Sequence, residues 1–198
     1  MSDPRTAYGA RAHEYAELLG HMEATAPEDR DLISRWAARQ DGLVLDVGCG
    51  PGHWTGWLAS RGVRIRGLDP VPEFVEIART AHSGTTFTRG GFADLTPGTC
   101  AGILAWYSLI HTPPGELHRH LRACFTALQP GGSLLLGLFE ALHDVGPAPF
   151  AHAVTRAWAW PASSMVRKLE EAGFVVVHQE RRSDRGARPH LALEARRS

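Results

Sequence analysis

The sequence predicts an α/β fold: a doubly wound, seven-stranded sheet, mostly parallel, with helices on both faces. Strand-like and helix-like segments alternate along the 198 residues, which is the order expected of a parallel sheet. The inner strands are apolar on both faces, as strands covered by helices on two sides must be. The last two strands alternate apolar and polar residues, which is typical of an antiparallel hairpin at a sheet edge.

In the first third of the chain we expect three helices, a buried strand and a glycine loop. The second helix begins at Pro27 and carries Leu32, Ile33 and Trp36 at helical spacing. The third should end at Gly62, because glycine favours helix ends. The helices are predicted over 10–20, 27–39 and 54–60, and the strand over 43–47.

The remaining elements follow the same alternation. Prolines open two helices, and the second of these has Leu117, Leu121 and Cys124 on one face. Residues 140–161 read as an irregular segment, and Gly173 ends the last helix. Helices are predicted over 72–82, 113–128 and 162–173. Strands are predicted over 63–69, 85–89, 101–110, 133–139, 174–182 and 189–197, with a turn at 130–132 and a hairpin loop at 183–188.

Composition excludes several classes of protein. The formal net charge is zero, so the molecule has no general attraction to nucleic acid or anionic membranes. The three cysteines form no C-x-x-C pair, which argues against a disulfide framework or a zinc site and fits a reducing cytoplasm. No apolar run resembles a signal peptide or spans a bilayer. We therefore expect a cytoplasmic protein without a metal.

The segment "LVLDVGCGPG" predicts a ligand-binding turn directly after the first strand. Gly48, Gly50 and Gly52 let a ligand approach the backbone closely and permit positive φ. Asp69 ends the next strand, 21 positions after Gly48, where a carboxylate accepts hydrogen bonds from ribose hydroxyls. The loop and Asp69 together indicate an adenosine-containing ligand.

Asp46 narrows the choice of ligand. Its carboxylate lies two residues before the loop, where it would repel the pyrophosphate of a dinucleotide and attract a cation. The glycine spacing is G-x-G-x-G, which differs from the G-x-G-x-x-G of dinucleotide sites. S-adenosylmethionine carries an ammonium, a sulfonium and no phosphate, so it fits better. A buried carboxylate bonded to loop amides remains an alternative for Asp46.

The motifs "VLDVGCGPG", "GLDP", "GGFADL", "AGILAWYSLIH" and "LQPGGSLLLGLF" resemble those of the class I S-adenosylmethionine-dependent methyltransferases. In particular, the chain is similar to the small bacterial members of the type 11 and type 25 group. The resemblance covers residues 40–140, and the tail "LEEAGFVVVHQERR" is also similar. It implies a Rossmann-like fold, S-adenosylmethionine as cofactor and S-adenosylhomocysteine as product. It also implies one domain with a helical cap (1–40), a cofactor-binding core (41–140), a lid or acceptor segment (141–161) and a C-terminal helix and hairpin (162–198).

The resemblance also implies roles for individual residues. Asp46 would lie near the ammonium of the cofactor, Asp69 would bind the ribose, and Asp94 would bind the adenine amino group. Trp106 and Tyr107 would lie beside the transferred methyl, and Tyr8 and Tyr15 would close over the cofactor unless they serve ordinary packing. The other implied cofactor contacts are Gly48, Cys49, Gly50, Gly52, Pro70, Phe92, Ala93 and Leu95.

His111 is the candidate catalytic base. It follows the fourth strand, and an imidazole titrates near neutral pH. A base is required only if the accepting atom is protonated, and a capping or surface histidine is the alternative. The stretch "HTPPG" has Thr112 and Gly115 where amino-methylating nucleic-acid enzymes carry Asp or Asn and an aromatic residue. This difference argues against a nucleic-acid substrate.

Aromatic residues of the segment 140–161 are predicted to form the acceptor pocket, because long segments at the active end of such sheets often act as lids. The candidates are Phe150, His152, Trp158 and Trp160. Core packing or a dimer contact is the alternative. We therefore expect a monomeric or homodimeric enzyme that methylates a small molecule. A nucleic-acid or protein methyltransferase, a nucleotide-linked oxidoreductase and a non-catalytic cofactor-binding protein are the competing interpretations.

Overall fold

The computed structural model describes residues 3–143, 145–183 and 187–198. The helices are α1 (Pro4–Gly9), α2 (Ala12–Leu19), α3 (Pro27–Ala37), α4 (His53–Ala59), α5 (Pro72–Ala81), α6 (Pro114–Ala127) and α7 (Ala162–Glu171), with 3-10 turns at Met22–Ala24 and Phe92–Asp94. The strands are β1 (Val44–Val47), β2 (Ile65–Asp69), β3 (Thr86–Arg89), β4 (Cys100–Trp106), β5 (Leu128–Phe139), β6 (Ala148–Ala151), β7 (Arg156–Ala159), β8 (Phe174–Arg182) and β9 (His190–Arg197).

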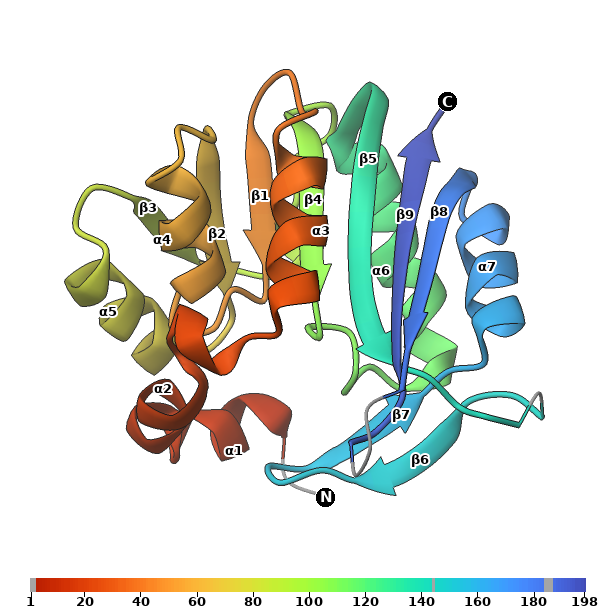
Figure 1. Ribbon diagram of the computed structural model, residues 1–198, viewed down its shortest axis with the longest axis horizontal. Helices are drawn as coiled ribbons and strands as arrows, with labels where there is room; N and C mark the ends of the chain where they lie inside the picture. The colour runs from red at the N-terminus through yellow and green to blue at the C-terminus, as the bar shows by residue number, and fades with distance from the viewer. Residues whose placement is uncertain (1–2, 144, 184–186) are drawn as a thin grey trace.

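Seven strands form the predicted sheet in the order β3-β2-β1-β4-β5-β9-β8 (Figure 1). The first five strands are parallel, and β9 pairs antiparallel with both β5 and β8. The α/β class, the seven strands and the C-terminal hairpin are therefore confirmed. Every residue of β1 is buried, and all except Asp46 are apolar, as expected when helices cover both faces of a sheet.

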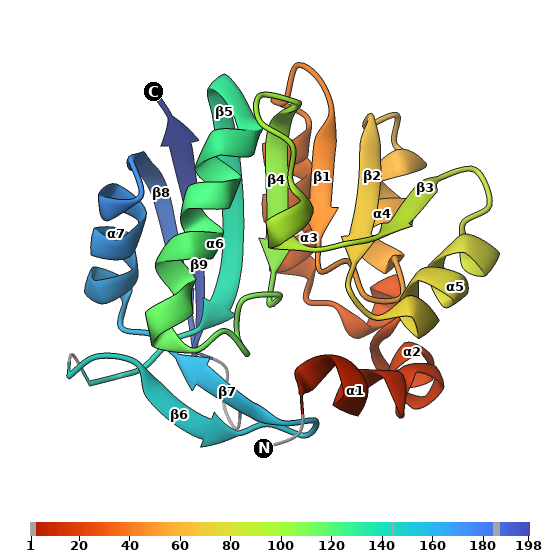
Figure 2. The ribbon, with the colours of Figure 1, turned by 180° about the vertical axis from the view of Figure 1, so that it is seen from behind.

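Two layers of helices enclose the sheet. Helices α3 and α4 cover the face seen in Figure 1, and α6 covers the opposite face, seen in Figure 2. On the α6 side, Leu117 and Leu121 of α6 share one buried cluster with Met165 and Leu169 of α7. On the α3 side the core includes Trp36. Burying these large apolar side chains supplies the main driving force for folding.

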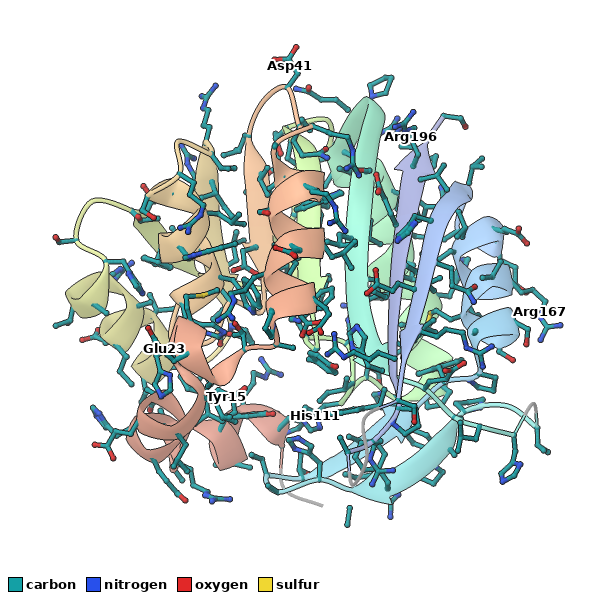
Figure 3. The ribbon with its side chains drawn as sticks, in the orientation of Figure 1. Tyr15, Glu23, Asp41, His111, Arg167 and Arg196 are labelled. Carbon is teal, nitrogen blue, oxygen red and sulfur yellow. The ribbon has the colours of Figure 1, made fainter. Side chains whose placement is uncertain are left out.

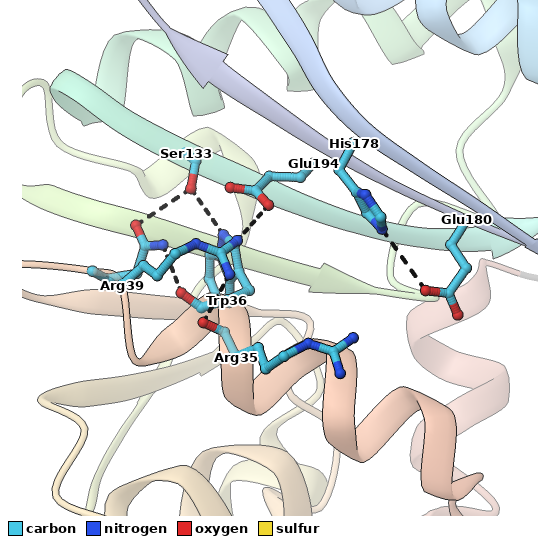
Figure 4. A network of polar contacts seen from close by, with 8 residues as sticks. Arg35, Trp36, Arg39, Ser133, His178, Glu180 and Glu194 are labelled. Carbon is cyan, nitrogen blue, oxygen red and sulfur yellow. Dashed lines mark hydrogen bonds and ion pairs between the residues drawn. The ribbon is translucent and has the colours of Figure 1, made fainter.

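Helix α3 is also fixed to the sheet by polar contacts (Figure 4). The indole Nε1 of Trp36 donates to the Ser133 hydroxyl at 2.8 Å, so its polar atom is satisfied inside the core. Arg39 donates to the buried Glu194 of β9 at 2.6 Å. These contacts join α3 and the residues just after it to β5 and β9.

The segment predicted to be irregular contains a hairpin, so that prediction was wrong. Strands β6 and β7 pair antiparallel and form a separate two-stranded sheet. Pro149 lies inside β6 and disfavours a strand in sequence-based reasoning. Strand β6 tolerates it, because β6 is the edge strand of this two-stranded sheet, where a missing N–H breaks no ladder.

Other predicted boundaries also moved. The fourth strand ends at Trp106 rather than residue 110, because Tyr107 has φ of 56° and turns the chain. Leu109 and Ile110 are nevertheless buried in the core, which explains their strand-like apolar pattern. The turn predicted at 130–132 lies within β5, where pairing with β4 shifts register. None of the described helices has the length and apolar character that crossing a bilayer requires.

Candidate active site

The candidate site lies at the carboxyl ends of β1, β2 and β4, where ligands bind in open α/β sheets. Helices α1 and α2 and the β6–β7 hairpin lie across this end of the sheet (Figure 1). Figure 3 shows Tyr15 and His111 on this side, between the N-terminal helices and the hairpin. The cap and the segment after β5 therefore face the same region as the glycine turn.

The three glycines of the turn after β1 have different reasons to be glycine. All have positive φ, between 55° and 88°, which other residues rarely adopt. A Cβ on Gly48 would meet the Ser108 Cβ at 2.3 Å, and one on Gly52 would meet Ala78 and Phe87 at 2.8 Å. A Cβ on Gly50 would meet nothing within 4 Å. Gly48 and Gly52 thus serve packing, and Gly50 borders open space.

Asp46 is buried and its Oδ2 accepts a hydrogen bond from the Thr55 hydroxyl of α4 at 2.6 Å. Asp46 is thus a buried carboxylate, as the alternative interpretation held, but its hydrogen-bond partner is the Thr55 side chain and not a loop amide. Burial raises the pKa of Asp46 to about 7; the hydrogen bond from Thr55 opposes the shift and nearby Asp69 adds to it. A cation placed here would favour the ionised form.

Asp69 is tied to the turn after β1. The Gly50 N–H donates to its Oδ2 at 2.8 Å, and the Val71 N–H donates to its Oδ1 at 2.8 Å. Burial raises the pKa of Asp69 to about 6, and the two amide hydrogen bonds oppose that shift. Each carboxylate oxygen has a second lone pair, so the group retains capacity for two ligand hydroxyls.

The residues predicted to surround the adenine form a short 3-10 turn after β3. Asp94 is exposed and its Oδ2 accepts from the Gly91 N–H at 2.9 Å. The Phe92 ring stacks on His120 of α6, with centroids 5.1 Å apart. His120 was not predicted. Ala93 is exposed, and Pro70 and Leu95 are half-buried in the same region.

Two predicted cofactor contacts are core side chains. The Cys49 thiol packs in a buried cluster with Val75, Ala78 and Phe87, and burial raises its pKa. The buried Trp106 ring contacts Trp54 and His190, with centroids 6.4 Å and 5.3 Å away. Only the backbone of Cys49 remains available to a ligand at the turn.

A continuous row of rings, here called the aromatic wall, crosses the site from β4 to α5. Neighbouring ring centroids are 4.8–6.3 Å apart along the row. The wall comprises Tyr107, Phe139, Phe150, His152, His111, Tyr8 and Phe74, with Tyr15 in contact with both Tyr8 and Phe74. This set of ring contacts therefore includes the predicted residues Tyr8, Tyr15, Tyr107, His111, Phe150 and His152.

His111 is held at both ring nitrogens. Its Nδ1 lies 2.8 Å from the Arg156 carbonyl oxygen, and its Nε2 lies 2.8 Å from the Tyr8 hydroxyl. A carbonyl oxygen can only accept, so Nδ1 carries the proton and Nε2 accepts from Tyr8. Burial lowers the pKa of His111 and the Arg156 carbonyl opposes this. The imidazole is therefore favoured in the neutral form that a base requires.

The predicted tryptophans of the acceptor segment are placed differently from its other residues. Trp160 is buried in the main core cluster, so it fits the packing alternative. Trp158 is half-buried. Its backbone N–H donates to the Ile110 carbonyl, and this bond joins β7 to the chain after β4. Phe150 and His152 remain on the aromatic wall.

Sequence reasoning missed Asp29, Ser108 and His190. The Ser108 hydroxyl is buried without a hydrogen-bond partner among the described residues, and it lies against Gly48. Asp29 and His190 come from distant parts of the chain and carry no motif. Among the described residues, no three His, Cys, Asp or Glu side chains are grouped as a metal site would need.

The sheet order with its reversed strand β9, and the glycine turn beside two buried carboxylates, define the class I methyltransferase architecture. The chain belongs to the family described as a methyltransferase domain, whose match covers residues 17–179.

Individual relatives agree with this family. The chain is 31% identical over 144 residues to the ubiquinone biosynthesis O-methyltransferase of Xanthomonas campestris pv. campestris; the match covers 69% of this chain and 57% of that protein. The chain thus spans a little over half the length of this curated relative.

Two solved structures share the fold. One is the 1,6-didemethyltoxoflavin-N1-methyltransferase of Burkholderia thailandensis, solved with 1,6-didemethyltoxoflavin and S-adenosylhomocysteine: TM-score 0.80, 21% identity, covering 100% of this chain and 92% of that one. The other is the magnesium protoporphyrin IX methyltransferase of Synechocystis PCC 6803 with bound S-adenosylmethionine: TM-score 0.77, 20% identity, covering 100% and 99%.

Proposed function

We propose that this protein transfers a methyl group from S-adenosylmethionine to a small-molecule acceptor. The observation that carries the proposal is the turn after β1. Gly50 borders open space while its N–H is bonded to Asp69, so backbone and carboxylate face one ligand position. Membership of the methyltransferase-domain family supports the same activity. The three proteins named above act on small molecules by their names, and two of them are solved with the cofactor or its product.

The carboxylates of this chain suit the two ends of the cofactor. We assign the ribose hydroxyls to Asp69, whose second lone pairs are available. Asp46 would face the ammonium, since a cation beside a buried carboxylate favours its ionised form. Asp94 would accept from the adenine amino group. When bound, the cofactor supplies an electrophilic methyl on a sulfonium, whose positive charge already activates the leaving group.

The aromatic wall provides the acceptor site. Phe139 and Phe150 form its apolar part, with ring centroids 5.3 Å apart and ring planes perpendicular. Apolar rings at this place would hold the acceptor in line with the methyl and exclude water, and such orientation supplies much of the acceleration in bimolecular transfer. The proposed cofactor and acceptor sites meet where Tyr8 contacts both Phe74 and His111.

We assign the proton of the acceptor to the Tyr8–His111 pair. Because Tyr8 donates to Nε2 of His111, the hydroxyl oxygen of Tyr8 can take a proton from the acceptor as it passes its own proton to His111. The Arg156 carbonyl holds the opposite nitrogen, which keeps the ring oriented for this transfer. His111 thus acts as the base through Tyr8.

Two measurements test the function. Calorimetry with S-adenosylmethionine, S-adenosylhomocysteine and NAD should show binding of the first two only. Transfer of a labelled methyl to pools of small molecules and to nucleic acids then identifies the acceptor class, and we expect label in small molecules. Binding of NAD without response to the other two ligands would contradict the proposal.

The base is tested by His111→Ala. We expect turnover to fall by about 10²-fold or more, the usual range for a lost general base, while the affinity for S-adenosylhomocysteine stays within about twofold. His118→Ala is the matched control, because His118 is exposed on α6. Unchanged turnover in the His111 variant would remove His111 from the mechanism.

A further inference from the structure

Arg188 brings a positive charge to the aromatic wall from the connection between β8 and β9. Its guanidinium carbon lies 3.8 Å from the centroid of the Phe150 ring. The Glu140 N–H donates to the Pro189 carbonyl at 2.8 Å, so the chain beside Arg188 is bonded to the chain directly after Phe139. Strand β9 begins two residues after Arg188, at the end of the sheet where the β6–β7 hairpin lies (Figure 1). The fold therefore fixes this arginine at the Phe150 part of the wall.

The guanidinium of Arg188 has unused hydrogen-bond donors. A guanidinium carries five N–H donors, and a phenyl ring is not a conventional acceptor, so the contact with Phe150 leaves these donors available. Among the residues that the structure describes, the Arg188 side chain makes no hydrogen bond or ion pair. The buried carboxylate of Glu140, which follows Phe139, is paired with Arg181 instead. Arg188 is therefore open to an external anion.

His152 connects Phe150 with the proposed base His111. The centroid of the His152 ring is 6.3 Å from that of Phe150 and 5.2 Å from that of His111. Burial lowers the pKa of His152, and the nearby His111 and Arg188 add to this shift. Within the described chain, no carboxylate contributes to the pKa shift of His152 or of His111. This part of the wall thus carries a positive charge that no neighbouring carboxylate balances.

We propose that Arg188 is a specificity-determining residue that binds a carboxylate of the methyl acceptor. A guanidinium matches a carboxylate with two parallel N–H···O bonds, and the rings of Phe139 and Phe150 would contact the body of the same molecule. The methylated atom, an oxygen or nitrogen that carries a proton, would then face Tyr8 and His111, two rings farther along the wall. The substrate class is therefore an aromatic acid with a hydroxyl or amino group. This inference rests on the proposed function.

The charges at the two ends of the wall favour this orientation of the acceptor. At the α1 end, the pKa of the Tyr8 hydroxyl is raised by burial first, and then by Tyr15 and Asp69. A carboxylate of the acceptor at that end would lie near the carboxylate of Asp69, and like charges repel. At the other end it would meet Arg188. The neutral O–H or N–H of the acceptor is thus left at Tyr8, where the proposed proton transfer takes place.

The substrate class is tested with matched acids and amides. Labelled-methyl transfer is measured with the ortho, meta and para isomers of hydroxybenzoate and aminobenzoate, and with the corresponding neutral amides. We expect at least one acid to have a kcat/KM about tenfold or more above that of its amide, the scale of a hydrogen bond to a charged group. The label should resist mild alkali, because an ether or a methylamine is stable where a methyl ester is not. Equal transfer to acids and amides, transfer to no acid, or alkali-labile label would each overturn the proposal.

Arg188→Met tests the residue directly, because methionine keeps an apolar stem against Phe150 and removes the charge and the donors. We expect kcat/KM to fall by about tenfold or more for the acid and to stay within about twofold of wild type for the amide. Arg188→Lys keeps the charge without the planar fork, so its value should lie between the two. Arg64→Met is the matched control, since Arg64 is exposed at the amino end of β2, the opposite end of the sheet. A preference for the acid that survives in Arg188→Met would contradict the assignment.

Binding of S-adenosylhomocysteine separates the two levels of inference. Arg188 is exposed, so we expect its variants to fold and to bind this ligand like the wild type. Absence of binding in the wild type would contradict the methyl-transfer function and the substrate class together. Binding combined with equal transfer to acids and amides would overturn the role of Arg188 alone. The comparison of acids with amides uses the wild-type protein, so it stands even if Arg188→Met unfolds.

Discussion

At the scale of single residues, the chemistry depends on two carboxylates that the fold has removed from water. Asp46 and Asp69 end adjacent parallel strands, and burial raises the pKa of both, to about 7 and about 6. Asp69 adds to the upward shift of the Asp46 pKa, and both carboxylates add to the upward shift of the Cys49 pKa. Without a cation nearby, these groups cost stability, and we expect that cost to vary with pH.

The substitution Asp46→Asn should stabilise the ligand-free protein at pH 8 and have little effect near pH 4. The unfolded chain releases the Asp46 proton near an ordinary pKa of about 3.9, whereas the folded chain keeps it until about pH 7. Stability contributed by Asp46 is therefore present below about pH 4 and lost as pH rises through 7.

A difference of roughly three pKa units sets an upper limit of about 4 kcal/mol for this gain at pH 8. Urea unfolding of both proteins at the two pH values measures it. Asparagine still accepts from the Thr55 hydroxyl, so the hydrogen bond with α4 is a constant in the comparison. A stability difference that is the same at both pH values would show that Asp46 ionises normally.

At the scale of elements, the N-terminal helices are held over the site by few contacts. Their apolar contact with the body is a small cluster that includes Ala12, Val71 and Phe74. Two hydrogen bonds extend to the opposite side: Tyr8 donates to His111, and Arg11 donates to the Ala153 carbonyl of the hairpin connection at 2.8 Å. Segments with so little buried area open most readily.

The substitution Tyr8→Phe should loosen α1 and α2 without affecting the sheet. Removing a hydrogen bond worth about 1 kcal/mol increases the open population about fivefold. We expect amide exchange to accelerate by this factor in residues 4–19 and to stay unchanged in β1 and β4. Tyr15→Phe is the control, since the Tyr15 hydroxyl makes no hydrogen bond to the described part of the chain and its ring contacts are retained. Equal exchange in both variants would show that the Tyr8–His111 bond does not hold the helices.

Elements with a regular period were predictable, and elements set by one residue or by distant contacts were not. The helix beginning at Pro114 was predictable from its opening prolines and the helical spacing of its apolar residues, and the strand β1 from its apolar composition. The end of β4 depends on the φ of Tyr107, which no neighbouring residue indicates. The β6–β7 hairpin contains Pro149 and lacks a regular alternation of apolar and polar residues, so its sequence predicts a loop. Only the structure shows that the two strands pair.

At the scale of the whole molecule, the site combines motifs that the sequence displays with contacts that only the fold creates. The glycine turn and Asp69 lie within one strand–helix–strand unit, so their spacing alone predicted a common ligand. Arg182 and Asp29 are 153 positions apart, and Tyr107 and His190 are 83 apart. Pairs this distant have no shared motif, and they meet because β8 and β9 return to the sheet beside α3 and β5.

A ligand that binds across this site should stabilise the whole chain, since the turn, the caps and the sheet all contribute to it. S-adenosylhomocysteine at 100 times its Kd adds about 2.7 kcal/mol. For a domain of this size, each kcal/mol raises Tm by about 2–4 °C, so we expect a rise of roughly 5–10 °C in a thermal melt. NAD at the same concentration should cause none.

Two alanine variants separate this binding effect from folding. Gly50→Ala places a methyl in open space, so the ligand-free protein should fold with a loss of about 1 kcal/mol while the ligand-induced rise in Tm disappears. Gly52→Ala forces contacts of 2.8 Å with Ala78 and Phe87, so it should lower Tm even without ligand, because a packed core has no room to yield. A full ligand response in Gly50→Ala would place the cofactor away from this turn, since a methyl at that position must obstruct anything that approaches the Gly50 backbone.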